Sequence, residues 1–236
     1  MPQSPVALAI IVFTLVMMVF SISLHDMTQA WMANRLGDPT ARMMGRITMN
    51  PMAHFDAWGM GLSPLLSIFI FHNRLPLGWG KPVPTTYRNF HSKNGEMLAV
   101  LAGPCAQFVA AVVSLIVMVV LKHHAEGGII SLQVAQILGK GVSVDALPPL
   151  PGIFPVMLLL YLSITMNLML LCLNILPFPF FDGGRLLLHF LPYNAAKKYE
   201  ELGMWMLVGF FLLAGPMISI IFSPLIGVFD GLLSWL

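Results

Sequence analysis

The sequence predicts an all-α polytopic membrane protein. Its composition and its uncharged stretches lead to this fold class, and its charge balance excludes a nucleic-acid-binding protein. Of the 236 residues, 58% are hydrophobic and only 9% are charged, whereas soluble domains carry about a quarter charged residues. Four uncharged stretches exceed the roughly 20 apolar residues that a helix needs to cross a bilayer. The 12 Lys and Arg residues nearly balance the 10 Asp and Glu residues, so the chain lacks the basic field that a nucleic-acid-binding protein needs.

The expected membrane helices follow from the uncharged stretches, which cover residues 2–24, 97–121, 147–181 and 202–229. Three prolines between 148 and 151 place the start of the third span near Gly152. The stretch 57–71 is shorter and contains glycine and proline, which indicates a re-entrant or interfacial piece. No basic residue precedes the first stretch and no small-residue cleavage site follows it, so we expect a retained helix.

One integral-membrane domain, 1–236, is expected, because the chain shows no repeat and no linker long enough to separate domains. Its core covers about 5–190, and further C-terminal membrane helices cover about 200–236. Within the core, we expect the segments 5–35, 97–121 and 152–176 to pack together.

The first polar group lies at the end of the first apolar stretch. Nothing between Leu24 and Leu36 would break a helix, so the helix is expected to continue through His25. His25 and Gln29 are then one turn apart on one face, with Asp26 beside them. Ionisable residues at membrane depth suggest a functional site, although these side chains could also simply reach the headgroup region.

The second polar group closes the third apolar stretch, from Asn174 to Arg185. Pro177 and Pro179 end the helix there, and the glycines after Asp182 permit a tight turn. Asp182 is therefore expected on irregular backbone, which survives at membrane depth when it lines a cavity or is buried in protein. For Asp182 taken alone, a capping role in a loop is the simpler interpretation.

Taken together, the two groups have the arrangement of a metal site built from a helical pair of ligands and a distant carboxylate. The chain resembles the site-2 proteases, a family of intramembrane zinc metalloproteases. The sequence H-D-M-T-Q at 25–29 stands where that family has H-E-x-x-H, and 174–183 matches its N-x-x-P-x-P-x-x-D-G segment. Four further stretches resemble bacterial members: LGDPTA at 36–41, GRITMNPMAHFD at 45–56, GWGKPVP at 78–84 and LAGP at 101–104.

The resemblance implies a site-2 protease-like core of three transmembrane helices plus a short segment, with an altered centre. His25 and Asp182 keep two metal-ligand positions, whereas Gln29 replaces the second histidine. Asp26 stands at the position of the general base, one methylene shorter than the family's glutamate. Each departure weakens hydrolysis, because zinc is held by Cys, His, Asp or Glu and a base must reach its water.

Other residues bear on the same expected site. Asn174 belongs to the matched segment, and Gln107 stands where the family often has an asparagine near the substrate. His54 and His189 lie on the same predicted side of the membrane and are alternative candidates for a third ligand.

Orientation follows from the shared site, which requires the helices that carry His25 and Asp182 to end on the same side. That side collects ten of the 12 basic residues: Arg35, Arg42, Arg46, Arg74, Lys81, Arg88, Lys93, Arg185, Lys197 and Lys198. The positive-inside rule makes it cytoplasmic. We expect an integral protein of a bacterial inner membrane with its polar site toward the cytoplasm.

The leading functional hypothesis is a catalytically degenerate protein that serves as a structural or accessory subunit of a membrane complex. Its partners would be other integral-membrane proteins and the lipid bilayer, with no nucleic acid and no cofactor. The alternative is an active intramembrane zinc metalloprotease that cleaves transmembrane helices. A third hypothesis, a porphyrin bound by His25, depends on that residue alone.

Overall fold

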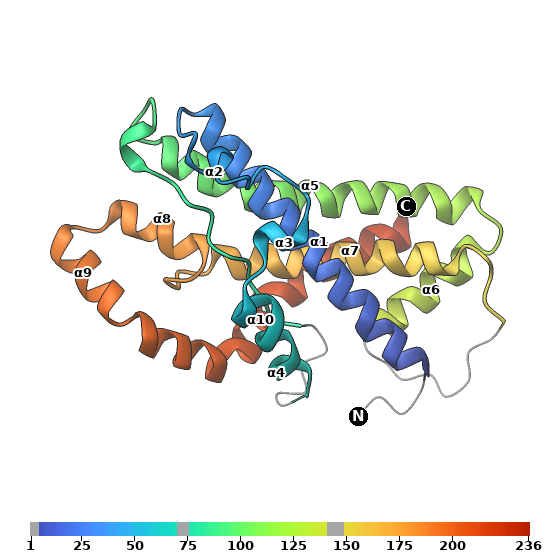
Figure 1. Cartoon of the computed structure of the whole chain (residues 1–236). Helices are drawn as coiled ribbons and strands as arrows, with labels where there is room; N and C mark the ends of the chain where they lie inside the picture. Colours follow the sequence, from blue (N-terminus) through green and yellow to red (C-terminus); the bar gives the residue numbers. More distant parts are fainter. Residues whose placement is uncertain (1–4, 70–75, 141–148) are drawn as a thin grey trace.

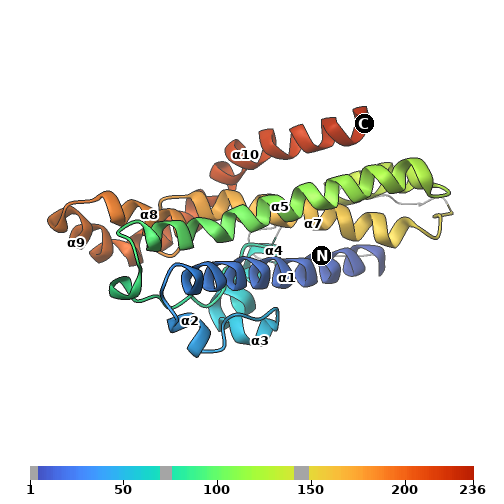
Figure 2. The same ribbon diagram turned by 90° about the horizontal axis from the view of Figure 1, so that it is seen from above.

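Three long helices form the centre of the protein. The computed structural model describes residues 5–69, 76–140 and 149–236, and the three are α1 (Pro5–Arg35), α5 (Gly95–His124) and α7 (Phe154–Ile175). They pack against one another, and α5 runs opposite to the other two (Figures 1 and 2). Each is long and apolar enough to cross a membrane. With no strand in the described ranges, the predicted all-α polytopic membrane fold is confirmed.

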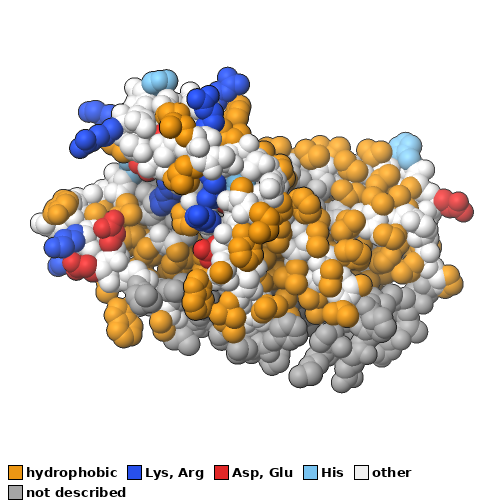
Figure 3. All heavy atoms as spheres, viewed as in Figure 1, with side chains coloured by type: hydrophobic (Ala, Val, Ile, Leu, Met, Phe, Trp, Pro, Cys, Tyr) orange, Lys and Arg blue, Asp and Glu red, His pale blue; other side chains and the backbone are white. Residues whose placement is uncertain are grey.

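The middle position belongs to α7. In the most apolar 18-residue segment of α7, 72% of the residues are buried inside the protein, whereas the corresponding share is 33% in α1 and in α5. A helix that is hydrophobic on all sides is buried by its neighbours or by lipid, and here α7 is covered by protein while α1 and α5 expose one face. Side chains such as Phe20, Val113 and Ile116 lie on those exposed faces. In the space-filling view, hydrophobic side chains predominate among the described residues on the right half of the molecule (Figure 3).

The end of the bundle where α1 and α7 finish and α5 begins is named the site end. There α1 ends at Arg35, and the chain turns at Gly37, whose φ of +112° suits glycine. Helix α7 ends at Ile175, because Pro177 disfavours helical backbone at the preceding Leu176, which is extended. The two helices that lead to the polar groups therefore finish at the same end of the bundle.

Short elements connect α1 to α5 at the site end: α2 (Thr40–Met43), α3 (Pro51–His54), the π-helix η1 (Ala57–Leu62), α4 (Ser63–Phe69) and the 3-10 helix η2 (Tyr87–Asn89). Together with the loops between them they are named the outer layer, and Figure 2 shows α2 and α3 on the side of α1 that faces away from α5 and α7. The short segment expected at 57–71 is helical over 57–69, and its last two residues lie outside the described ranges.

Asp38 fixes this layer. Its buried carboxylate accepts hydrogen bonds from the backbone of Thr40 (3.1 Å) and Thr86 (2.6 Å) and from the Asn89 amide (3.0 Å). Burial alone would raise the pKa of Asp38, but these hydrogen bonds and that of the Thr40 hydroxyl outweigh it and hold the pKa below its ordinary value. One carboxylate thereby joins the segment after α1 to the segment before α5.

The remaining helices are α6 (Gly128–Gly139), α8 (Asp182–Phe190), α9 (Tyr193–Glu201) and α10 (Gly203–Trp235). Helix α6, to which the sequence analysis assigned no element, packs on α5 and α7. Far from the site end, Asp230 of α10 pairs with Lys140 (2.8 Å) and accepts hydrogen bonds from Gln136 and Tyr161. These contacts fasten the end of α10 to α6 and α7.

Candidate functional site

A buried histidine–aspartate pair lies at the centre of the site end. His25 of α1 places its Nε2 2.9 Å from Oδ2 of Asp182, the first residue of α8, and both side chains are less than a tenth exposed. Asp182 reaches this position because α8 begins against the end of α7. A Cβ on Gly183 would collide with the Ile175 carbonyl, and one on Gly184 would collide with that of Phe178. The Asp-Gly-Gly sequence is therefore what lets the carboxylate meet His25.

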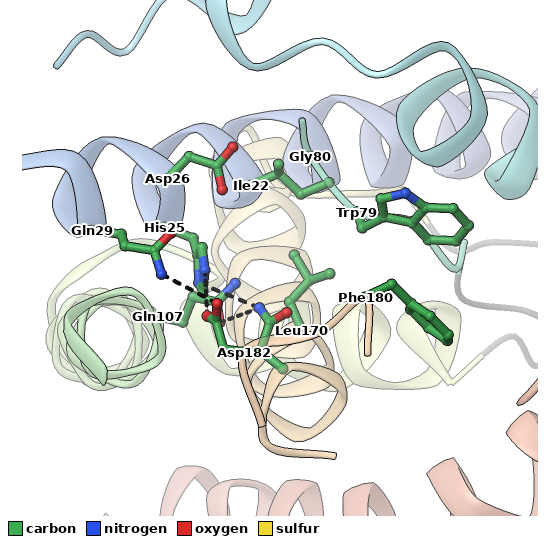
Figure 4. A pocket seen from close by; sticks show the side chains of 12 residues that line it. Ile22, His25, Asp26, Gln29, Trp79, Gly80, Gln107, Leu170, Phe180 and Asp182 are labelled. Carbon is green, nitrogen blue, oxygen red and sulfur yellow. Dashed lines mark hydrogen bonds and ion pairs between the residues drawn. The ribbon is translucent and has the colours of Figure 1, made fainter. Parts of the chain in front are cut away.

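Three side-chain amides surround this pair (Figure 4). Gln29 donates from Nε2 to Asp182 Oδ1 at 3.2 Å. Asn174 of α7 lies with Nδ2 3.3 Å from His25 Nδ1 and donates to Gln107 Oε1 at 3.4 Å. Each oxygen of Asp182 and each nitrogen of His25 thus has a polar neighbour supplied by the chain itself.

Close packing on α5 holds the imidazole from the other side. A Cβ added to Gly103 would fall inside contact distance of three ring atoms of His25, so only glycine fits there. A cavity of about 50 Å³ lies beside the polar group, enough for a few water molecules. It is lined by the His25, Asp182 and amide side chains and by apolar residues that include Leu170 and Phe180.

Asp26 borders the cavity, but the nearest charged or ionisable neighbours of its carboxylate come from the outer layer. Its Oδ2 lies 3.3 Å from His54 Nδ1 and 3.6 Å from the Arg46 guanidinium. Gln29 and Asn174 are the amides that the sequence places nearest to the two buried carboxylates; Gln29 donates to Asp182, whereas the neighbours of Asp26 are His54 and Arg46. Successive helical residues project about 100° apart, so His25 faces the bundle while Asp26 faces the outer layer.

Arg46 is the partner that sequence reasoning missed. It is almost fully buried, and it also donates to the carbonyl of Lys81. Burial lowers the pKa of Arg46, and the nearby Asp26 opposes that shift. The only sequence signal was its place in the matched stretch 45–56, which does not specify a partner.

The two alternative histidines lie elsewhere. His54 is buried with Nε2 2.8 Å from the Thr48 carbonyl, and its other nitrogen faces Asp26. His189 is exposed at the end of α8 with its ring against Phe190. Among the residues that the structure describes, no three His, Cys, Asp or Glu side chains form a group that could hold a metal ion.

The fold and the site together define a class of protein: a helical membrane protein whose His–Asp pair is buried where three long helices meet at one end. The chain belongs to peptidase family M50, whose family model matches residues 13–216. It is 25% identical over 221 residues to a protein of Bacillus subtilis (strain 168) named "Putative zinc metalloprotease YwhC", an alignment that covers 93% of this chain and 88% of that relative. The comparison with solved structures gave no match.

Proposed function

We propose that this chain is a catalytically degenerate member of the family that acts as a structural or accessory subunit of a larger membrane complex. The observation that carries the proposal is the hydrogen bond from Gln29 to Asp182. Gln29 stands where the family has its second histidine ligand, and it donates a hydrogen bond to a carboxylate that a metal would need as a ligand. The substitution replaces a metal–ligand interaction with an interaction within the protein.

The donor set supports the same interpretation. Catalytic zinc sites keep three ligands from Cys, His, Asp or Glu and leave one position for water. Here the centre offers one imidazole and one carboxylate, and a neutral amide is a poor zinc ligand beside them. The residues do not fit a catalytic zinc, and we propose that the chain works without a cofactor.

The position of Asp26 further supports loss of hydrolysis. A general base must lie within about 2.6 to 3.2 Å of the proton that it abstracts, directly or through one water. The Asp26 carboxylate instead faces His54 and the cationic Arg46. In this arrangement Asp26 holds the outer layer to α1.

The proposed surroundings are other integral-membrane proteins and the lipid of a bacterial inner membrane, with the site end toward the cytoplasm. The positive-inside rule supports this orientation, since exposed basic residues of the described chain gather at the site end: Arg35, Arg42, Lys81, Arg88, Lys93, Lys197 and Lys198.

A working intramembrane zinc metalloprotease is the second candidate. The retained His25 and Asp182 favour it, as does the printed name of the Bacillus relative. In that case zinc would be the cofactor and transmembrane helices the substrates.

Elemental analysis of the chain purified without chelator separates the two candidates. We expect no stoichiometric zinc in the natural chain, about one zinc per chain in Gln29→His, and loss of that zinc in Gln29→His/Asp182→Asn. The double variant is the matched control, because it keeps the new histidine and removes only the carboxylate. About one tightly bound zinc in the natural chain, with cleavage of a transmembrane substrate that Asp182→Asn abolishes, would overturn the proposal.

The subunit role needs a separate measurement. The tagged chain is extracted from its own membranes in mild detergent, and the proteins that elute with it are quantified. We expect a second integral-membrane protein at a fixed molar ratio, unchanged on repeated size-exclusion chromatography. Elution of the chain alone would count against an accessory role, whatever the metal content.

A further inference from the structure

The layer outside α1 lies at the depth of the membrane surface. A helix crosses the hydrocarbon core in about 20 residues, and the uncharged stretch of α1 ends at Leu24. The core boundary therefore falls close to Asp26, to which Arg46 and His54 are attached. Side chains of the outer layer that point away from α1 consequently meet the headgroup region rather than the interior of the protein.

Large apolar side chains occupy that outward position. The segment 43–58 exposes four methionines and two aromatic residues: Met43, Met44, Met49, Met52, Phe55 and Trp58. Met43, Met52 and Trp58 are 78%, 74% and 69% exposed. These six residues are named the outer face. A group of exposed large apolar side chains is typical of an interaction site, and tryptophan is enriched where membrane meets water.

The charges beside the outer face have one sign. In residues 31–69 and 76–95, every exposed charged side chain is basic. Three of these basic residues, Arg35, Arg42 and Lys81, lie on segments that adjoin the outer face. The acidic side chains of the same ranges are withdrawn: Asp38 is buried among hydrogen bonds, and Asp56 accepts from the backbone of Trp58 and Gly59. An apolar surface edged by cations complements an anionic leaflet.

We propose that the outer face inserts into the headgroup layer of the membrane and selects anionic phospholipid through Arg42 and Lys81. Methionine and tryptophan provide adaptable apolar contact with the upper acyl chains, while the two cations meet the phosphates. The inference does not depend on the catalytic state of the centre. It gives the segment between α1 and α5 a function of its own.

Fluorescence of Trp58 tests the proposal in reconstituted vesicles. The other four tryptophans, Trp31, Trp79, Trp205 and Trp235, are changed to phenylalanine, and helix content is checked by circular dichroism. Vesicles contain phosphatidylcholine with a rising fraction of either brominated phosphatidylglycerol or brominated phosphatidylcholine. We expect quenching by both lipids, with roughly a 25-fold preference for the anionic one, because each of the two basic side chains contributes about fivefold at such a surface.

Two matched controls locate the effect. In Arg42→Gln/Lys81→Gln the preference is expected to fall to about one, whereas Lys197→Gln/Lys198→Gln removes the same charge from α9 and should leave it unchanged. If the variant with four tryptophans changed to phenylalanine loses helix content, the quenching of Trp58 can be obtained in another way. It is then the difference in quenching between the natural chain and Trp58→Phe, which carries a single exposed substitution. Absence of quenching, which means that water or a protein covers Trp58, overturns the proposal. Equal quenching by the two lipids, or an equal loss in both charge variants, also overturns it.

Discussion

Removing the charge of Asp26 should lower the free energy of unfolding of the whole chain. In Asp26→Asn the buried Arg46 guanidinium keeps its hydrogen bond to Lys81 but loses the carboxylate that lies 3.6 Å away. Breaking a buried ion pair by neutralising one partner costs about 3 to 5 kcal/mol. For a domain of this size that corresponds to a fall of roughly 6 to 20 °C in unfolding temperature.

A thiol-reactive dye measures the unfolding in detergent. Cys172 is buried in α7 and becomes reactive only when the bundle opens, and exposed Cys105 is changed to alanine in every variant. Asp26→Asn/Arg46→Gln completes a double-mutant cycle, and its loss should be smaller than the sum of the two single losses, because removing both partners leaves no unpaired charge.

Two results would refute this reasoning. A change below about 0.5 kcal/mol in Asp26→Asn would place the substitution with ordinary surface changes and show that the carboxylate is not paired. Strictly additive losses around the cycle would show that Asp26 and Arg46 act independently.

Two further predictions concern packing and pH. Gly103→Ala should displace the His25 ring and destabilise the chain by about 1 to 3 kcal/mol, which thermal unfolding measures. The control is Gly209→Ala, where an added Cβ meets no atom within 4 Å. Equal effects of the two substitutions would contradict the contact between Gly103 and His25. Because the pKa of Asp38 is lower in the folded chain than its ordinary value of 3.8, its stabilisation is present above that value and is lost as the pH falls through the folded pKa. Asp38→Asn should therefore lower the unfolding temperature at neutral pH and flatten its decline in acid, and unfolding curves that stay parallel across the pH range would count against this.

The long helices could be predicted from sequence because one physical requirement dominates them. A span must be apolar over its whole length, and few charged residues interrupt α1, α5 or α7. Helix α6 failed the same criterion, since its 12 residues lie in an apolar run between Glu126 and Lys140 that is too short to cross. It forms because α5 and α7 bury one of its faces, which is a tertiary effect.

The centre could be predicted in part for a similar reason. The spacing of His25 and Gln29 on one helix, and the breakers around Asp182, determine local backbone that the sequence encodes directly. The partners of Asp26 depend on how the segment after Gly37 returns to α1. No local periodicity specifies that return, so Arg46 and His54 were not foreseen as its neighbours.

Neighbouring residues of α1 at positions 25–29 belong to two separate networks of side chains. His25 and Gln29 belong to a network inside the bundle, while the adjacent Asp26 belongs to a network with the outer layer. A substitution at position 29 therefore changes contacts of the His25–Asp182 pair, whereas a substitution at position 26 changes contacts with Arg46 and His54. Although the two positions lie within one turn of the same helix, their side chains act on separate parts of the structure.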